Sequence, residues 1–363
     1  MNPTRQLHDL GQSLWLDNIT RGLLTSGTLR RYIKEFSVTG LTSNPTIFDH
    51  AITNDQSYDD SIRSKALAGE SGEALFFHLA LEDVIQAADL FRSIHDATGG
   101  VDGWVSLEVS PLLADDTAAT VRAAAQLHAR ARCPNLLIKI PGTPAGIPAI
   151  EETIFAGVPV NVTLLFSREH YIAAAEAYMR GIERRIAAGL DPVVASVASL
   201  FVSRWDVAIM DKVAQQYRNG LGIVVAMRVY QAYRDLLAAK RWRKLAAAGA
   251  RPQRLLWAST GSKDPAAADV LYVEALAAPD TINTIPETTL LAFADHGKVG
   301  KLLPLDTGHA EAVLAEYTRE GVDIDALAAR LQKDGTEAFA KSWQALIGRI
   351  AEKSQALAKA GPP

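Results

Sequence analysis

The chain has 363 residues, of which 48% are hydrophobic, and 37 basic residues against 41 acidic ones give a net charge of −4. This composition is typical of a folded globular protein and excludes disorder for most of the chain, while the charge argues against nucleic acid or an anionic membrane as a partner. A single cysteine, Cys133, excludes an internal disulfide and a cysteine-based zinc site.

Short apolar runs alternate with alanine-rich helical stretches along almost the whole sequence. Several runs are continuously apolar, which is typical of strands buried on both faces of a parallel sheet. The eight predicted strands are Ser13–Asp17, Val38–Asn44, Val105–Val109, Leu136–Ile140, Val160–Leu165, Val194–Phe201, Leu255–Ser259 and Thr281–Ile285.

Helical spacing fills the segments between the runs. It is clearest at Leu81, Val84, Ile85 and Ala88, and again at Tyr171, Ala174, Ala175 and Tyr178, with Ser167 as the expected N-cap. Asp115, Asp116 and Thr117 open another predicted helix, with its acids at the positive end of the helix dipole.

Strand–helix alternation repeated eight times predicts a (β/α)₈ barrel, with a doubly wound open sheet as the alternative. After Ile285 only helical pattern remains, through Trp343 to a polar tail. We therefore expect one domain over residues 1–363, in which residues 286–363 form helices packed around the barrel.

In such a barrel the carboxyl ends of the strands face the active site, and polar residues lie at or near these ends here. They are Asp17, Asn44, Glu108, Lys139, Asn161, Thr163, Ser199 and Ser259.

Lys139 lies inside the apolar run LLIKI and is followed by a proline. A buried ammonium is unfavourable unless it is paired, and burial lowers a lysine pKa so that free amine can attack a carbonyl. Lys139 is therefore either a Schiff-base nucleophile or a structural partner of Glu108 or Asp17. These two carboxylates could move protons or serve only as charge partners. The asparagines, Ser259 and Thr163 could hold substrate hydroxyls or simply end strands.

Two cations suggest a phosphate site. Arg204 follows the sixth strand near the start of a helix, and Lys263 lies in the loop STGSKDP after the seventh. Barrels often bind phosphate near strands seven and eight. The alternative is that both are solvated surface charges.

Other function classes lack their motifs. Gly142 and Gly146 lack the spacing and the lysine of a P-loop, and His78 with Glu82 forms no complete metal site. The histidines avoid the strand ends, so neither a Ser-His-Asp triad nor histidine-based zinc catalysis has a candidate base or ligand set. Cys133 is interpreted as a buried structural thiol.

No apolar run approaches the ~18 residues of a membrane span and no signal-peptide layout is present, so we expect a soluble cytoplasmic protein.

The motifs together resemble the transaldolase family. The matching stretches are WLDNITR, TGLTSNPTIF, VSLEVSP, NLLIKIPGT, VNVTLLFS, ASLFVSR and STGSKDP, in family order from Gly11 to about Gln355. The likeness is greatest to the long form, including the transaldolase half of fusions with glucose-6-phosphate isomerase.

The resemblance implies a (β/α)₈ barrel with metal-free class I aldolase chemistry and no cofactor. It implies that Lys139 is the Schiff-base lysine, that Glu108 is an acid/base acting through a water held with Thr163, and that Asp17 takes the proton of the C4 hydroxyl. It further implies that dihydroxyacetone hydroxyls are held by Asn44, Asn161 and Ser259, and phosphate by Ser199 and Arg204. Short forms carry arginine where this chain has Lys263, so we expect Lys263 to bind phosphate as a point charge.

The implied reaction is ping-pong transfer of dihydroxyacetone in the non-oxidative pentose phosphate pathway. Its donor is sedoheptulose 7-phosphate or fructose 6-phosphate, and its acceptor is glyceraldehyde 3-phosphate or erythrose 4-phosphate. Two alternatives stay open: a fructose 6-phosphate aldolase that releases dihydroxyacetone, and a catalytically silent sugar-phosphate-binding barrel. The sequence does not decide the oligomeric state, and a homodimer stays open.

Overall fold

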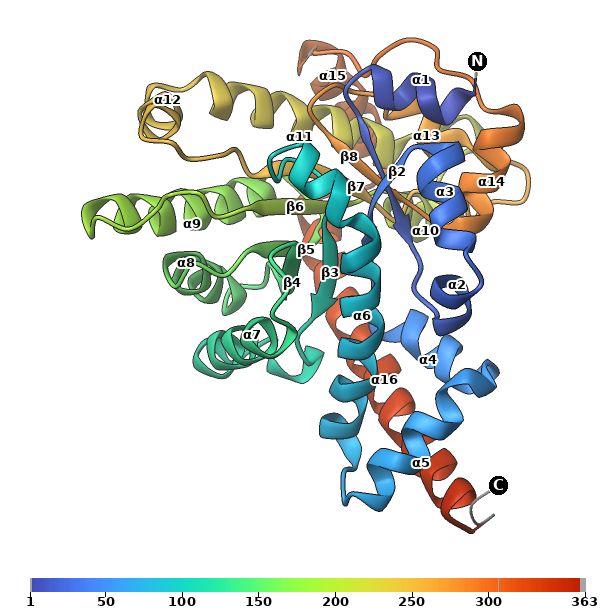
Figure 1. Cartoon of the computed structure of the whole chain (residues 1–363). Helices are drawn as coiled ribbons and strands as arrows, with labels where there is room; N and C mark the ends of the chain where they lie inside the picture. Colours follow the sequence, from blue (N-terminus) through green and yellow to red (C-terminus); the bar gives the residue numbers. More distant parts are fainter. Residues whose placement is uncertain (1, 306, 360–363) are drawn as a thin grey trace.

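The computed structural model of the chain describes residues 2–305 and 307–359. Within them eight parallel strands close into a barrel in which each strand pairs with the next in sequence and β8 pairs with β1. Figure 1 shows strands of the barrel at the centre of the molecule with helices around them. This closed order confirms the predicted (β/α)₈ barrel and excludes the open sheet. The strands are β1 (Ser13–Asp17), β2 (Val38–Thr42), β3 (Val105–Glu108), β4 (Leu136–Pro141), β5 (Val160–Leu165), β6 (Ser196–Phe201), β7 (Arg254–Ala258) and β8 (Ile282–Ile285).

Helices surround the barrel and precede, separate and follow its strands. They are α1 (Pro3–Asp9), α2 (Arg21–Thr25), α3 (Thr28–Phe36), α4 (Pro45–Asn54), η1 (Gln56–Tyr58), α5 (Asp59–Leu67), α6 (Gly72–Ala97), η2 (Pro111–Leu113), α7 (Thr117–Ala131), α8 (Gly146–Phe155), α9 (Arg168–Ala187), α10 (Ser203–Ile209), η3 (Gln215–Tyr217), α11 (Leu221–Ala238), α12 (Lys240–Ala247), α13 (Leu271–Ala275), α14 (Glu287–His296), α15 (Thr307–Arg319) and α16 (Ile324–Lys359).

The predicted helix signals are confirmed. The Leu81–Ala88 pattern lies within α6, the Ser167 hydroxyl accepts from His170 N to begin α9, and Asp116 accepts from Ala119 N to begin α7. Helical structure continues after β8, in α14, α15 and α16. Burial and local hydrogen bonding therefore agree with the sequence pattern for most of the barrel.

Several predicted strand ends are wrong by one or two residues. β2 ends at Thr42 rather than Asn44, because the Asn44 side chain accepts from Ile47 N and caps α4, with Pro45 as its first residue. β3 ends at Glu108, β4 extends to Pro141, and β6 begins at Ser196 rather than Val194. The strand β7 is shifted by one residue, to Arg254–Ala258, and β8 begins one residue later than predicted, at Ile282.

The amino-terminal end of the barrel is filled by a hydrogen-bonded group that we call the base cluster: Ser13, Trp15, Asp102 and Arg254. Asp102 accepts from the Ser13 hydroxyl and from Trp15 Nε1 at 2.7 Å, while Arg254 Nη2 donates to Ser13 Oγ at 2.8 Å. Trp15 lies so close to Gly40 that a Cβ there would be 2.6 Å from its ring. Only glycine therefore lets β2 pass this side chain.

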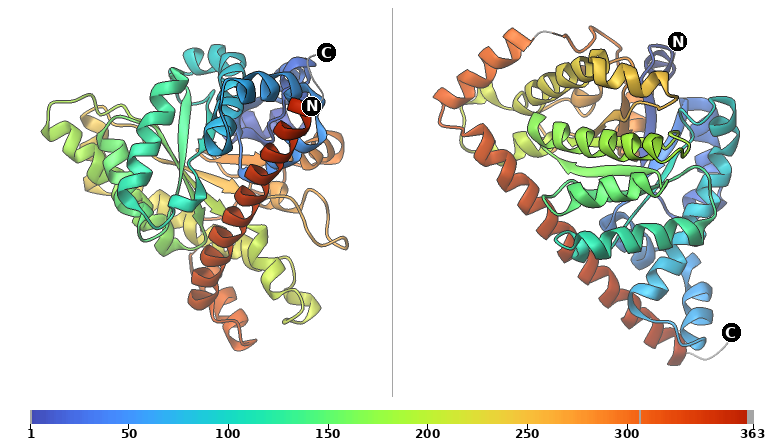
Figure 2. Two further views of the ribbon diagram at one scale, coloured as in Figure 1. Left: turned by 90° about the horizontal axis from the view of Figure 1, so that it is seen from below. Right: turned by 90° about the vertical axis from the view of Figure 1, so that its left-hand side faces the viewer.

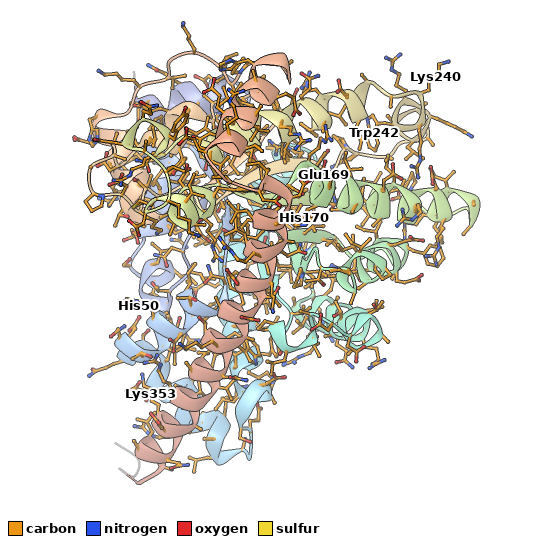
Figure 3. The ribbon with its side chains drawn as sticks, turned by 180° about the vertical axis from the view of Figure 1, so that it is seen from behind. His50, Glu169, His170, Lys240, Trp242 and Lys353 are labelled. Atoms are coloured by element: carbon orange, nitrogen blue, oxygen red, sulfur yellow. The ribbon has the colours of Figure 1, made fainter. Side chains whose placement is uncertain are left out.

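The long helix α16 takes a route that helical periodicity does not reveal. It packs against α4, α5 and α6 and reaches β5, and Figure 2 shows it crossing the molecule as one continuous helix. Seen from behind in Figure 3, it runs over the barrel towards Lys353. Lys353 Nζ donates to Ile52 O at 2.9 Å and pairs with Asp59 at 2.7 Å, which fixes the far end of the helix to α4 and α5.

Two further observations concern Cys133 and the hydropathy of the helices. Cys133 is buried with a free thiol, as predicted for a structural cysteine. None of the helices in the described part of the chain is long and apolar enough to cross a membrane.

Candidate active site

A cavity of about 840 Å³ opens at the carboxyl ends of the strands. Eight of the ten candidate residues line it, from six strands or the loops that follow them. They are Asp17, Asn44, Lys139, Thr163, Ser199, Arg204, Ser259 and Lys263. The other two, Glu108 and Asn161, are buried and contact residues that line the cavity.

Lys139 and Glu108 form the centre of the site. The register of β3 with β4 places them side by side, and Lys139 Nζ lies 3.1 Å from Glu108 Oε2 and donates to Ser43 O at 3.1 Å. Both side chains are nearly inaccessible, at 6% and 3% exposure. Burial raises the pKa of Glu108, and the neighbouring Lys139 ammonium only partly opposes this.

The ion pair that the sequence allowed as a structural alternative is therefore present, but it is incomplete. Among the described residues neither Glu108 Oε1 nor Thr163 Oγ1 has a hydrogen-bond partner. Buried polar atoms are normally paired, so such exceptions point to a bound water or to a catalytic role. Lys139 and Thr163 also line the cavity. An ion pair with a purely structural role would be covered by protein on all sides, whereas the Lys139–Glu108 pair borders the cavity.

Asp17 is the second carboxylate of the site. Its Oδ1 accepts from Thr42 Oγ1 at 2.8 Å, and the Thr42 hydroxyl lies 2.5 Å from that of Thr284. Burial raises the pKa of Asp17, while Lys139 acts in the opposite direction. A carboxylate with a raised pKa facing the cavity is suited to accept and return a proton.

Asn161 and Ser199 form a hydrogen-bonded layer beneath the cavity. Asn161 Nδ2 donates to Ser106 Oγ at 3.1 Å, and its Oδ1 accepts from Ser199 Oγ at 2.7 Å. Asn161 is fully buried, so it reaches the cavity through Ser199 rather than directly.

Ser259 and Asn44 lie at backbone turns on the rim. Ser259 has φ +56°, a left-handed conformation that is unusual for serine, and its hydroxyl lies 2.9 Å from that of Ser203. Such conformations are often found at functional sites. The side-chain oxygen of Asn44 caps α4, and the same residue lines the cavity. Asn44 can therefore have both a structural role and a role in the site.

Arg204 and Lys263 bring two positive charges to the same cavity. Arg204 lies on the short helix α10 with its Cζ 5.0 Å from the Phe201 ring centre, and Lys263 is exposed in the loop after β7. Within residues 2–305 and 307–359 no carboxylate forms an ion pair with either side chain. Their charges are thus free to meet an anionic ligand, which favours the phosphate site over two solvated surface charges.

Sequence reasoning missed several residues that line the cavity. Thr42, Thr284 and Phe201 lie on strands, and their positions relative to the strand ends could have identified them. Leu331, Asp334 and Phe339 come from α16, and no local signal places that helix over the barrel.

The arrangement has the parts needed for chemistry on a phosphorylated carbonyl compound. A buried amine beside one carboxylate can attack a carbonyl, a second carboxylate can take a hydroxyl proton, and two cations can hold an anionic group.

Comparison with known proteins agrees with this geometry. The profile of the Transaldolase/Fructose-6-phosphate aldolase family matches residues 14–350. A transaldolase of Arthrobacter sp. (strain FB24) is 44% identical over 357 residues, covering 96% of both chains. A transaldolase of Frankia alni is 44% identical over 97% of both chains, and one of Thiobacillus denitrificans is 44% identical over 96% of this chain and 100% of its own length.

Proposed function

The chain belongs to the Transaldolase/Fructose-6-phosphate aldolase family, and from this membership we propose that Lys139 is the Schiff-base nucleophile of a transaldolase. The reaction transfers a dihydroxyacetone unit from a ketose phosphate to an aldose phosphate. The observation that carries the assignment is the position of Lys139 Nζ, buried at the cavity floor 3.1 Å from the Glu108 carboxylate.

The first step is formation of the iminium. The Lys139 amine adds to the C2 carbonyl of a ketose phosphate such as fructose 6-phosphate, and Glu108 takes and returns the protons that accompany loss of water. Its raised pKa suits this exchange. A water held between Glu108 Oε1 and Thr163 Oγ1 would satisfy two atoms that otherwise have no partner in the described part of the chain.

The second step is cleavage. Asp17 takes the proton from the C4 hydroxyl, the C3–C4 bond breaks, and its electron pair moves towards the iminium nitrogen. An aldose phosphate leaves, and a dihydroxyacetone enamine stays bound to Lys139. The enamine then attacks an acceptor aldehyde, Asp17 returns the proton, and hydrolysis frees the new ketose. Thr42, which donates to Asp17 at 2.8 Å, orients the carboxylate for both transfers.

Substrate binding is divided between two groups of residues that line the cavity or lie beneath it. Asn44 and Ser259 hold hydroxyls of the three-carbon unit, and Asn161 supports them through Ser199. Arg204 and Lys263 bind the phosphate, supported by the absence of carboxylate partners for them among residues 2–305 and 307–359.

We also propose that the chain forms one domain and that it is located in the cytoplasm. The contacts of α16 with α4, α5 and α6 support one domain over residues 1–363. The buried, unpaired thiol of Cys133 suits a reducing compartment, in agreement with a cytoplasmic location.

The test is to incubate the protein with fructose 6-phosphate, reduce it with borohydride, and map the modified peptide by mass spectrometry. We expect a dihydroxyacetone-sized adduct on Lys139, and loss of that adduct when erythrose 4-phosphate is added before the reductant. An adduct on another lysine, or none in a sample shown to bind the sugar phosphate, would overturn the assignment. Release of free dihydroxyacetone at near-full rate without acceptor would indicate an aldolase instead.

A further inference from the structure

One aromatic side chain lies beside both Lys139 and Arg204. Phe339, on α16, has its ring centre 5.5 Å from Lys139 Nζ and 5.7 Å from Arg204 Cζ. It lines the cavity and is only 6% exposed. At these distances a ring attracts a cation through its π face. Phe339 is therefore in contact with both the nucleophile and the proposed phosphate ligand.

The helix holds this ring in a fixed place. Gln332 Nε2 donates to Gly142 O and to Leu164 O, each at 3.0 Å, which ties α16 to the loop after β4 and to the end of β5. Gly335, one turn before Phe339, lies so close to the barrel that a Cβ would be 2.9 Å from Leu164 Cδ2 and 3.3 Å from Arg204 Nη1. Together with the Lys353 contacts at the far end, these make Phe339 a fixed cover rather than a flap.

The ring differs in chemistry from the two polar groups that pair with the Lys139 nitrogen. Nζ otherwise contacts the Glu108 carboxylate and the Ser43 carbonyl, which are both polar. A phenyl ring brings no titratable proton and binds no water strongly, so it excludes water from the side of the nitrogen that it covers. This matters most after cleavage, when the aldose phosphate has left and only the enamine remains.

We propose that Phe339 is a specificity-determining residue that favours transfer of the three-carbon unit over its release to water. The inference rests on the proposed function of Lys139. In the release reaction the enamine carbon takes a proton from water, water then adds to the iminium carbon, and the C–N bond breaks. The net change is enamine plus one water giving the free Lys139 amine and dihydroxyacetone.

The experiment compares Phe339→Leu and Phe339→Ala with a matched control, Trp343→Phe. Trp343 is one turn further along α16 and is also buried, but it packs on Phe76 and Phe77 and donates to Glu73. The measured quantity is the rate of dihydroxyacetone release from fructose 6-phosphate without acceptor, divided by the rate of transfer to erythrose 4-phosphate. This ratio does not depend on the fraction of folded enzyme, so a merely structural effect leaves it unchanged.

We expect the ratio to rise about tenfold in both Phe339 variants, with the larger rise in Phe339→Ala, and to stay at the wild-type value in Trp343→Phe. An unchanged ratio in both Phe339 variants, or an equal rise in the control, would overturn the inference. Borohydride trapping separates this outcome from failure of the proposed function. A Lys139 adduct in the wild type with an unchanged ratio in the variants removes only the role of Phe339. Absence of the wild-type adduct removes the role of Lys139 itself.

Discussion

Two buried carboxylates, Asp102 and Glu108, lie at opposite ends of the same barrel and have very different surroundings. Asp102, in the base cluster, accepts from Ser13, from Trp15 and from Gly103 N at 3.2 Å. Glu108, beneath the cavity, has the Lys139 ammonium beside one oxygen, and in the described part of the chain its other oxygen has no partner. A buried polar group with all its partners stabilises the fold, whereas one left partly unpaired beside a cavity can react.

The comparison is most strongly tested by removing the nucleophile. Lys139→Ala should lower turnover on the order of 10⁴-fold or more, because the covalent route is lost. Glu108 can protonate when its partner is removed, since burial already raises its pKa, so we expect a cooperative thermal unfolding transition to remain. Turnover is measured by transfer to erythrose 4-phosphate, and activity within tenfold of wild type would refute the assignment.

Removing the carboxylate of the base cluster should give the opposite pattern. Asp102→Ala leaves the donors of Ser13 and Trp15 unpaired, so the free energy of unfolding should fall by about 4 kcal/mol. The kcat of the folded fraction should stay unchanged. Urea unfolding and active-site titration by borohydride trapping check the two statements. A loss of kcat with intact stability would show that the base also serves the reaction.

A third buried carboxylate sharpens the comparison. Asp206 accepts from Leu221 N at 2.9 Å, Gly222 N at 3.2 Å and Tyr272 Oη at 2.8 Å, and burial raises its pKa to about 6 against these hydrogen bonds. The raised pKa means that folding favours the protonated form of Asp206. The stability that Asp206 contributes by this titration is therefore fully present below pH 3.8, the ordinary pKa, and is lost as the pH rises through about 6.

Asp206→Asn removes this titration. The unfolding free energy of wild type minus that of the variant should therefore fall by up to about 3 kcal/mol between pH 4 and pH 7. Urea unfolding of both proteins at several pH values measures this difference. A difference that stays constant with pH would mean that Asp206 titrates alike in the folded and unfolded chain.

The smallest effect is expected at the rim of the cavity. Lys263 is exposed, so Lys263→Ala should raise the KM for fructose 6-phosphate only about five- to tenfold and leave kcat nearly unchanged. The KM for unphosphorylated glyceraldehyde as acceptor should not change. Lys298→Ala, at another exposed lysine outside the cavity, is the control. Equal effects on phosphorylated and unphosphorylated substrates would show that Lys263 is not a phosphate ligand.

The sequence predicts the strand-borne part of the site because parallel strands in a barrel all point the same way. Polar residues near the ends of seven predicted strands must then meet at one mouth, and Asp17, Lys139 and Ser199 do so. The place of Asn161 could not be predicted, since its partners Ser106 and Ser199 belong to other strands. Phe339 could not be predicted either, because helical periodicity shows that α16 has a buried face but not which surface covers it.

The position of α16 in the chain has a consequence for the order of events during translation. Chains leave the ribosome amino end first, and every strand of the barrel precedes Ile324. Lys139 and Arg204 can therefore be assembled on the nascent barrel before Phe339 has been made. Before α16 docks, Lys139 lacks the Phe339 ring that we propose shields it from water. If Phe339 favours transfer as proposed, α16, which is made after every strand of the barrel, decides when the nascent chain becomes selective for transfer.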